Sequence, residues 1–111
     1  MGTLNFDQLF KDLQSGAESV AEQSLKDYVG QAKQDGKSAI NSIKGNLQRW
    51  ASEIENGALT KDDLEFLLQE ETALDEMTAL KQAGLAVIQI DKFRNALINM
   101  ILGTLTGLVK V

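Results

Sequence analysis

Apolar residues recur at helical intervals along the whole chain. Near the N-terminus the interval is i, i+3, i+4 and i+7, the pattern of one face of an amphipathic helix, at Phe6, Leu9, Phe10 and Leu13. Asn5 and Gln8 have the spacing of a capping box at its start. We therefore predict a short amphipathic helix over residues 5–14. Ser15-Gly16 either ends this helix or only bends one that continues.

A longer apolar stripe follows. Its ten residues are all small or apolar and are separated by 4, 3 and 4 positions, repeated three times: Ala21, Leu25, Tyr28, Ala32, Gly36, Ala39, Ile43, Leu47, Trp50 and Ile54. Such an 11-residue repeat keeps a stripe nearly straight along one helix. The pattern predicts a long helix over residues 17–55, with charged residues such as Asp35 in solvent. Glycine weakens a helix by up to about 1 kcal/mol, so a break near Gly36 is an open alternative.

Asn56-Gly57 is the strongest turn signal in the chain. Because helical periodicity flanks it, we predict a turn over residues 56–60 that joins two helices. Thr60 is placed to cap the second of these, and Asp62 and Asp63 follow in its first turn, where the helix dipole favours anions. The sequence predicts an acidic amphipathic helix over residues 61–82.

The C-terminal segment is apolar on most sides. One seam alternates spacings of 4 and 3, at Ala86, Ile90, Phe93, Leu97 and Met100. The 14 residues from Ala96 to Val109 carry no formal charge. We predict an apolar helix over residues 85–109, after a bend near Gly84. A helix of this kind must be surrounded by protein or by lipid, and this uncharged run is shorter than the roughly 20 residues that span a bilayer.

These elements predict an all-α fold in a single domain, residues 1–111. We expect a small bundle of three to four helices, built on a long helical hairpin. Three coverings for the apolar C-terminal helix remain open: its own chain, a second copy that completes the bundle by oligomerisation, or lipid.

Small residues mark places where helices can approach closely. Ala32, Gly36 and Ala39 lie at the centre of the predicted long helix, and Gly103 and Gly107 form a G-x-x-x-G pattern near the C-terminus. We hypothesise that these two patches face each other, within one chain or between chains. Leucine at Gly36 or at Gly103 would then destabilise the fold or the oligomer. The other residues predicted to serve helix packing or self-association are large: Trp50, Phe93, Leu97 and Met100.

Composition excludes much chemistry. The 111 residues include no His and no Cys, so Ser-His and Cys-His dyads, the usual zinc sites and disulfides cannot form. No glycine-rich phosphate loop is present. We therefore expect a non-enzyme without a cofactor or metal, and infer no small-molecule substrate. The net charge of −5, without a visible basic face, argues against direct nucleic-acid binding.

Acidic residues crowd the predicted third helix. Seven lie within 15 positions: Asp62, Asp63, Glu65, Glu70, Glu71, Asp75 and Glu76. A solvated helix face explains such a run; the functional alternative is a surface for a basic partner at Glu70, Glu71, Asp75 and Glu76. Glu71 and Asp75, four apart, repel each other by a few tenths of a kcal/mol, which hints at an external counter-charge. Further on, Asp91 is spaced to pair with Arg94 on a narrow solvent-facing strip.

The function class that fits is a non-catalytic helical assembly or protein-interaction module acting through apolar helix faces, as a homo-oligomer or with a protein partner. The alternative is a peripheral membrane-associated protein whose C-terminal apolar segment contacts lipid. An 11-residue amphipathic period suits a helix that lies on a lipid surface, whereas net negative charge disfavours anionic lipid. Without cysteine or a signal peptide, the expected location is cytoplasmic, or membrane-peripheral on the alternative.

Overall fold

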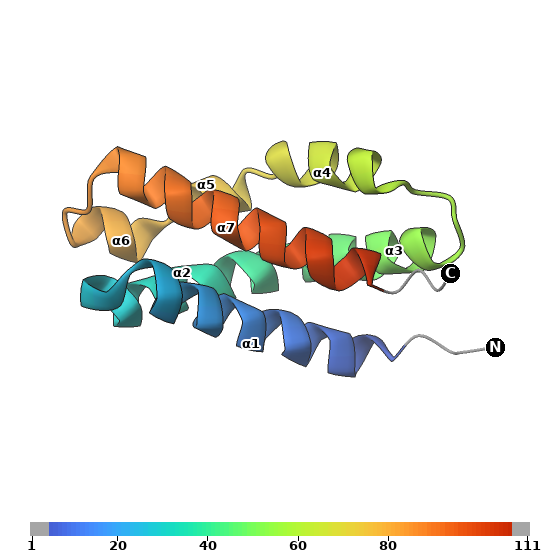
Figure 1. The fold of residues 1–111 in the computed structure, drawn as a ribbon, viewed down its shortest axis with the longest axis horizontal. Helices are drawn as coiled ribbons and strands as arrows, with labels where there is room; N and C mark the ends of the chain where they lie inside the picture. Colours follow the sequence, from blue (N-terminus) through green and yellow to red (C-terminus); the bar gives the residue numbers. More distant parts are fainter. Residues whose placement is uncertain (1–4, 108–111) are drawn as a thin grey trace.

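The chain runs back and forth along one long axis as four consecutive arms (Figure 1), over residues 5–107, which the computed structural model describes. Each arm is antiparallel to the one before it, and the described part measures 46 × 23 × 22 Å. The all-α prediction is confirmed. In chain order the elements are α1 (Phe6–Ser24), the short 3₁₀ helix η1 (Lys26–Tyr28), α2 (Val29–Ser42), α3 (Lys44–Glu55), α4 (Lys61–Gln69), α5 (Ala73–Glu76), α6 (Thr78–Gln82) and α7 (Val87–Thr106). The first arm is α1, the second comprises α2 and α3, the third comprises α4, α5 and α6, and the fourth is α7.

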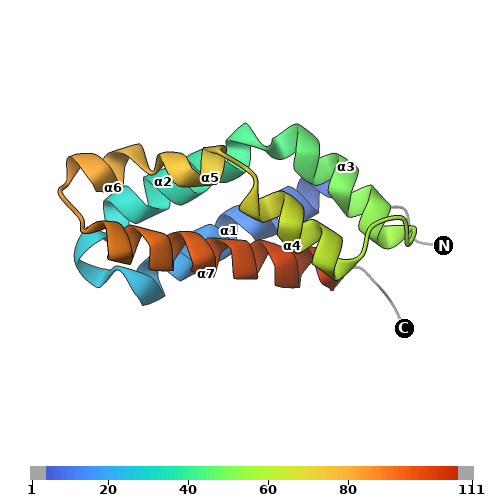
Figure 2. The same cartoon turned by 90° about the horizontal axis from the view of Figure 1, so that it is seen from above.

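The fourth arm, α7, buries one face in the core and exposes the other. It packs against α1, α3, α4 and α6. Figure 1 shows it between α1 and α4, and Figure 2 shows it passing over α1. Its buried apolar side chains come from all along the helix: Ile90, Phe93, Leu97, Ile98, Ile101, Leu102 and Leu105. From Ile90 to Leu105 the large apolar side chains of this segment are therefore covered by their own chain, Met100 only partly. Residues 108 and 109 of the predicted helix lie outside the described residues.

Two predicted helix boundaries in the first half are wrong. Ser15 and Gly16 lie inside α1, which continues to Ser24 instead of ending at residue 14. The single helix predicted over residues 17–55 is also divided. The backbone leaves helical geometry at Leu25 (φ −136°, ψ 71°), where the chain reverses, and again at Ile43 (φ −106°, ψ 19°).

The apolar stripe is nevertheless buried. Nine of its ten residues are buried and Tyr28 is partly so. The stripe keeps its period across the reversal at Leu25 because the helices before and after it both turn an apolar face to the same core. Periodicity thus predicts which side chains are buried and does not predict the direction of the chain. Gly30 and Gly45 are each the second residue of a new helix, α2 and α3, where their weak helix propensity interrupts nothing.

The chain turns at Asn56 and Gly57, where Gly57 has φ 83°. Thr60 then caps α4 through a reciprocal pair of hydrogen bonds. The Asp63 amide donates to Thr60 Oγ1 at 3.1 Å, and the Thr60 amide donates to Asp63 Oδ2 at 3.2 Å. The helix starts at Lys61 for the reason that the sequence indicates.

The continuous helix predicted over residues 61–82 is wrong, because the third arm is interrupted twice. α4 ends at Gln69, and the four-residue α5 is separated from the five-residue α6 by Met77. Met77 has φ 39° and ψ 47°, a left-handed conformation that is uncommon outside glycine. Gly84, with φ 84°, ends the arm before α7.

Candidate functional site

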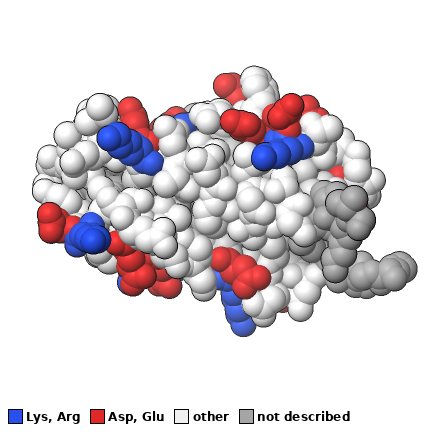
Figure 3. Space-filling view, in the orientation of Figure 1, with Lys and Arg blue, Asp and Glu red and all other residues white. Residues whose placement is uncertain are grey.

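Phe66 lies on the outer face of α4 and is 65% exposed. Leu64 and Leu68 of the same helix are buried, and a position two residues from each faces away from them. The helical neighbours of Phe66, three and four positions away, are all polar: Asp62, Asp63, Gln69 and Glu70. On the face drawn in Figure 3, acidic side chains gather at the upper edge, over α4. An exposed aromatic ring therefore stands among carboxylates.

Sequence reasoning assigned no role to Phe66. The signal was present, because Phe66 falls off the line of Leu64 and Leu68 by about half a helical turn. Val87 and Ile88, at the start of α7, are the other large apolar side chains exposed among the described residues, at 73% and 66%. In the sequence they belong to an apolar segment, and nothing there distinguishes them from its buried residues.

The four acidic residues predicted to form a surface for a basic partner do not share one environment. Glu71 turns toward α3, where its Oε2 accepts a hydrogen bond from Asn46 Nδ2 at 3.1 Å. Asp75 turns toward α7 and pairs with Arg94. Glu70 and Glu76 are exposed. The predicted repulsion between Glu71 and Asp75 along one helix is wrong, because α4 ends at Gln69 and α5 begins only at Ala73. Asp75 has its counter-charge in Arg94, whereas the partner of Glu71 is the neutral Asn46.

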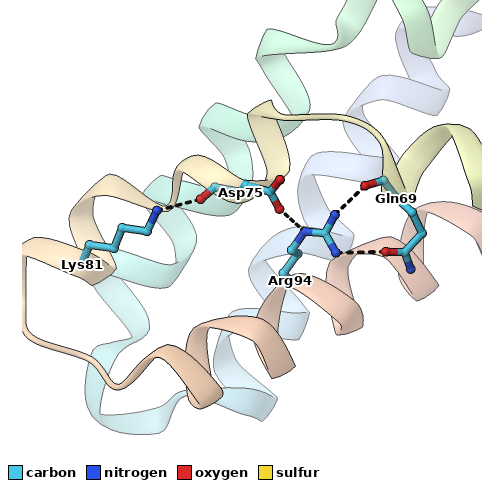
Figure 4. A network of polar contacts seen from close by, with 4 residues as sticks. All are labelled: Gln69, Asp75, Lys81 and Arg94. Atoms are coloured by element: carbon cyan, nitrogen blue, oxygen red, sulfur yellow. Dashed lines mark hydrogen bonds and ion pairs between the residues drawn. The ribbon is translucent and has the colours of Figure 1, made fainter.

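Arg94 links α7 to the interrupted third arm (Figure 4). Its Nη1 donates to Gln69 Oε1 at 3.1 Å and its Nη2 donates to the Gln69 carbonyl at 2.9 Å. Its Nε forms an ion pair with the Asp75 carboxylate, while Lys81 Nζ donates to the Asp75 carbonyl at 2.8 Å. The predicted pairing of Arg94 with Asp91 is wrong, because the guanidinium reaches the end of α4 instead.

Arg94→Met should lower the free energy of unfolding by about 1–2 kcal/mol. The change keeps the apolar stem but removes hydrogen bonds from a charged group that is only 14% exposed. The ion pair itself adds little, because the Asp75 side chain is 56% exposed. Urea unfolding followed by circular dichroism measures the change. Lys92→Met, at an exposed position of the same helix, is the control and should stay within about 0.5 kcal/mol; equal losses would mean that Arg94 does not hold the arm.

Asp35 makes a second link to the third arm. Its side chain lies on α2 and is 7% exposed. Oδ1 accepts from the Ala79 amide at 2.9 Å and Oδ2 accepts from the Leu80 amide at 2.8 Å. α6 has no side-chain cap from its own N-cap residue, Met77, so Asp35 performs that role from another arm. The prediction that Asp35 is solvated is wrong, and no local pattern marks it, because its partners lie 44 and 45 positions away.

The predicted packing residues are only partly brought together. Ala32, Ala39 and Trp50 are buried. A Cβ built on Gly36 would lie 3.4 Å from Ala17 Cβ and 3.5 Å from side-chain atoms of both Phe93 and Leu97. α2 thus approaches α1 and α7 closely at Gly36, as a small residue allows.

Gly103 and Gly107 do not meet the small residues of α2 within the chain. Both are exposed, and a Cβ on Gly103 would find no described atom within 4 Å. The hypothesis of two facing patches is therefore wrong within one chain. The small residue that lies against α7 near its C-terminal half is Gly16 of α1. A Cβ on Gly16 would come within 2.5 Å of Met100 Sδ on α7. Gly16 thus permits the close approach of α1 to the half-buried Met100.

The surface of the bundle is hollowed at the ends of its arms. A pocket of about 360 Å³ is lined by Ser24, Leu25, Gln89, Lys92 and Phe93. Another, of about 320 Å³, lies between α5, α6 and α7, where Met77, Val87 and Arg94 line it. Both lie at the lower end of the range for small-molecule sites. Over residues 5–107, no three acidic side chains are grouped as metal ligands would be.

Within the same described range, no helix combines the length and the apolar character that crossing a membrane requires. No protein-family model, curated protein or solved structure matches this chain.

Proposed function

We propose that this protein is a non-catalytic helical module that binds a protein partner through the outer face of α4. The observation that carries the proposal is the exposure of Phe66, at 65%, on a bundle whose other phenylalanines are buried. Burial is worth about 25 cal/mol for each Å² of apolar surface, and an exposed ring leaves that free energy to be gained from a partner. Aromatic side chains are enriched at the centres of interfaces and dominate their energetics.

The charge around Phe66 favours a basic partner. α4 and the residue after it carry Asp62, Asp63, Glu65 and Glu70, against one base, Lys61. Complementary charge speeds encounter and suppresses wrong partners. Phe66 would supply affinity and the carboxylates would supply selectivity. Of the four acidic residues predicted from the sequence, Glu70 is the one on this face, next to Phe66 in helical position.

The membrane-peripheral alternative has less support. It needs the C-terminal apolar segment at the surface, and the apolar side chains of α7 from Ile90 to Leu105 pack against other helices instead. Val87 and Ile88 are exposed at the start of that helix. They provide a second exposed apolar site with which binding at Phe66 can be compared.

A peptide titration tests the proposal. The ¹⁵N-labelled protein is titrated with a synthetic amphipathic helix of lysine and leucine, and with a matched helix of glutamate and leucine. We expect chemical-shift changes on α4 with the lysine peptide alone, weakened by salt because the attraction is electrostatic. Phe66→Ser should raise the Kd about tenfold, equivalent to about 1.4 kcal/mol.

Ile88→Ser is the matched control, because Ile88 is 66% exposed and Phe66 is 65% exposed. The control should leave the Kd unchanged. Shift changes centred on Val87 and Ile88, or equal binding of both peptides, would contradict the proposal. A concentration-dependent mass in light scattering that Phe66→Ser abolishes would assign the face to a second copy of the chain, in place of a basic partner.

A further inference from the structure

We propose that residues 70–82 form a strap that opens as a unit while the rest of the bundle stays folded. The strap comprises the chain after α4 together with α5 and α6. Its helices are four and five residues long, far too short to be stable alone. Its conformation therefore depends on contacts with the neighbouring arms. This inference is independent of the α4 face proposed above.

Strain lies at the centre of the strap. Met77 joins α5 to α6 with φ 39° and ψ 47°, although its side chain is only 2% exposed. Non-glycine residues hold such a conformation only where their surroundings impose it, and such strain is concentrated in parts of proteins that switch. Releasing the strap would let Met77 relax, so strain favours the open form.

Packing around the strap is incomplete on both sides. On the α7 side, the pocket of about 320 Å³ is lined by Leu74 and Met77. On the α2 side, a hollow of about 100 Å³ is lined by Asp35, Ala73 and Met77. The strap thus has a hollow on each side, while α5 and α6 pack on α2 between them. Short segments of this kind open at lower free energy than the long helices of the core.

Three polar latches hold the strap closed, one each from α2, α3 and α7. Asn46 of α3 donates to Glu71 Oε2 at 3.1 Å. Asp35 of α2 accepts hydrogen bonds from the Ala79 and Leu80 amides at 2.9 and 2.8 Å. Arg94 of α7 pairs with the Asp75 carboxylate. Opening breaks all three latches. It also moves Leu74, Met77 and Leu80, which are at most 2% exposed when the strap is closed, into solvent.

Native-state hydrogen exchange in low urea tests this inference in the full chain. The probes are the amides of Leu74, Leu80 and Lys81, which donate to Glu71 O, Asp35 Oδ2 and Met77 O. We expect these amides to converge on one opening free energy and to exchange at least about tenfold faster than the slowest amides of α7. Their exchange should also depend less steeply on urea, because less surface is exposed than in global unfolding.

Two substitutions separate strap opening from global unfolding. Asp35→Asn weakens a contact that only the closed, folded form makes, because the open and the unfolded forms both lack it. The substitution should therefore raise the exchange rates of the strap amides and of the slowest α7 amides by the same factor. Ile101→Val, at a fully buried position of α7, weakens contacts that persist when only the strap opens. It should speed the slowest α7 amides about fivefold and leave the strap amides unchanged.

The inference is overturned if Ile101→Val speeds both sets of amides equally, since the strap would then open only when the whole bundle unfolds. It is also overturned if Leu74, Leu80 and Lys81 exchange at unrelated rates, which would indicate local fraying. Both substitutions are mild enough to keep the chain folded. Asp35→Asn retains one carbonyl acceptor, and Ile101→Val removes a single methyl group.

Discussion

Phe93→Ala is expected to lower the free energy of unfolding by about 3–5 kcal/mol, the usual cost of removing a buried phenylalanine ring. Phe93 is fully buried on α7. Its ring packs against α2, because a Cβ built on Gly36 would lie 3.5 Å from Phe93 Cζ. The site cannot collapse easily, because α7 is held by α1, α3, α4 and α6. A domain of this size has a total stability of about 5–15 kcal/mol, so the loss is a large fraction of the whole.

Urea unfolding followed by the fluorescence of Trp50, which is 3% exposed, measures the loss. Phe66→Ala is the matched control, because it removes the same ring from a position that is 65% exposed. It should change the free energy of unfolding by no more than about 0.5 kcal/mol. If both variants lost the same amount, Phe66 would be covered in solution, and the argument for a free α4 face would fail.

This pair of phenylalanines shows what hydrophobic pattern does and does not predict. The seam that contains Phe93 was predicted from spacings of 4 and 3, and its burial follows from that pattern. Phe66 belongs to no seam. A residue off the apolar face of a helix is expected in solvent, and Phe66 is exposed for that reason. Pattern therefore sorted buried from exposed positions well. An apolar stripe marks buried positions only, so an exposed phenylalanine is recognised by its absence from every stripe.

The direction of the chain was harder to predict. The stripe from Ala21 to Ile54 keeps its period across Leu25, where the chain reverses. Nothing local marks this reversal, since neither proline nor glycine occupies residues 20–29. Tertiary packing decides it, because reversal brings α1 against both α2 and α7.

Long-range polar contacts could not be predicted at all. Asp35 has the spacing of a solvated residue, and Arg94 has a convenient local partner in Asp91. Each instead reaches the interrupted third arm, 44 and 25 positions away in sequence. The interruption itself leaves backbone amides and a carbonyl without helical partners. Side chains from other arms form hydrogen bonds with these groups. The contacts therefore depend on the breaks in the third arm, which the sequence does not predict.

Gly36→Leu is expected to lower the free energy of unfolding by about 3 kcal/mol, at the upper end of the usual cost of overpacking. A Cβ at this position already meets Ala17, Phe93 and Leu97 at 3.4–3.5 Å. That is ordinary contact, with no room for three further carbons. Gly36→Ala should therefore be neutral or stabilise by up to about 1 kcal/mol, because alanine is the better helix former. Thermal melting resolves these changes, since 1 kcal/mol shifts the Tm of a small domain by several degrees.

Gly103→Leu separates packing within the chain from packing between chains. Gly103 is exposed, and a Cβ there meets no atom within 4 Å among the described residues, apart from its chain neighbours and the backbone of its own helix. In a monomer the substitution should change stability by less than about 1 kcal/mol, and in the favourable direction, because leucine is a better helix former than glycine. If Gly103→Leu instead lost as much as Gly36→Leu, and lost more at higher protein concentration, another copy of the chain would have to cover this face. The dependence on concentration decides between the two cases, because only an interface between chains responds to mass action.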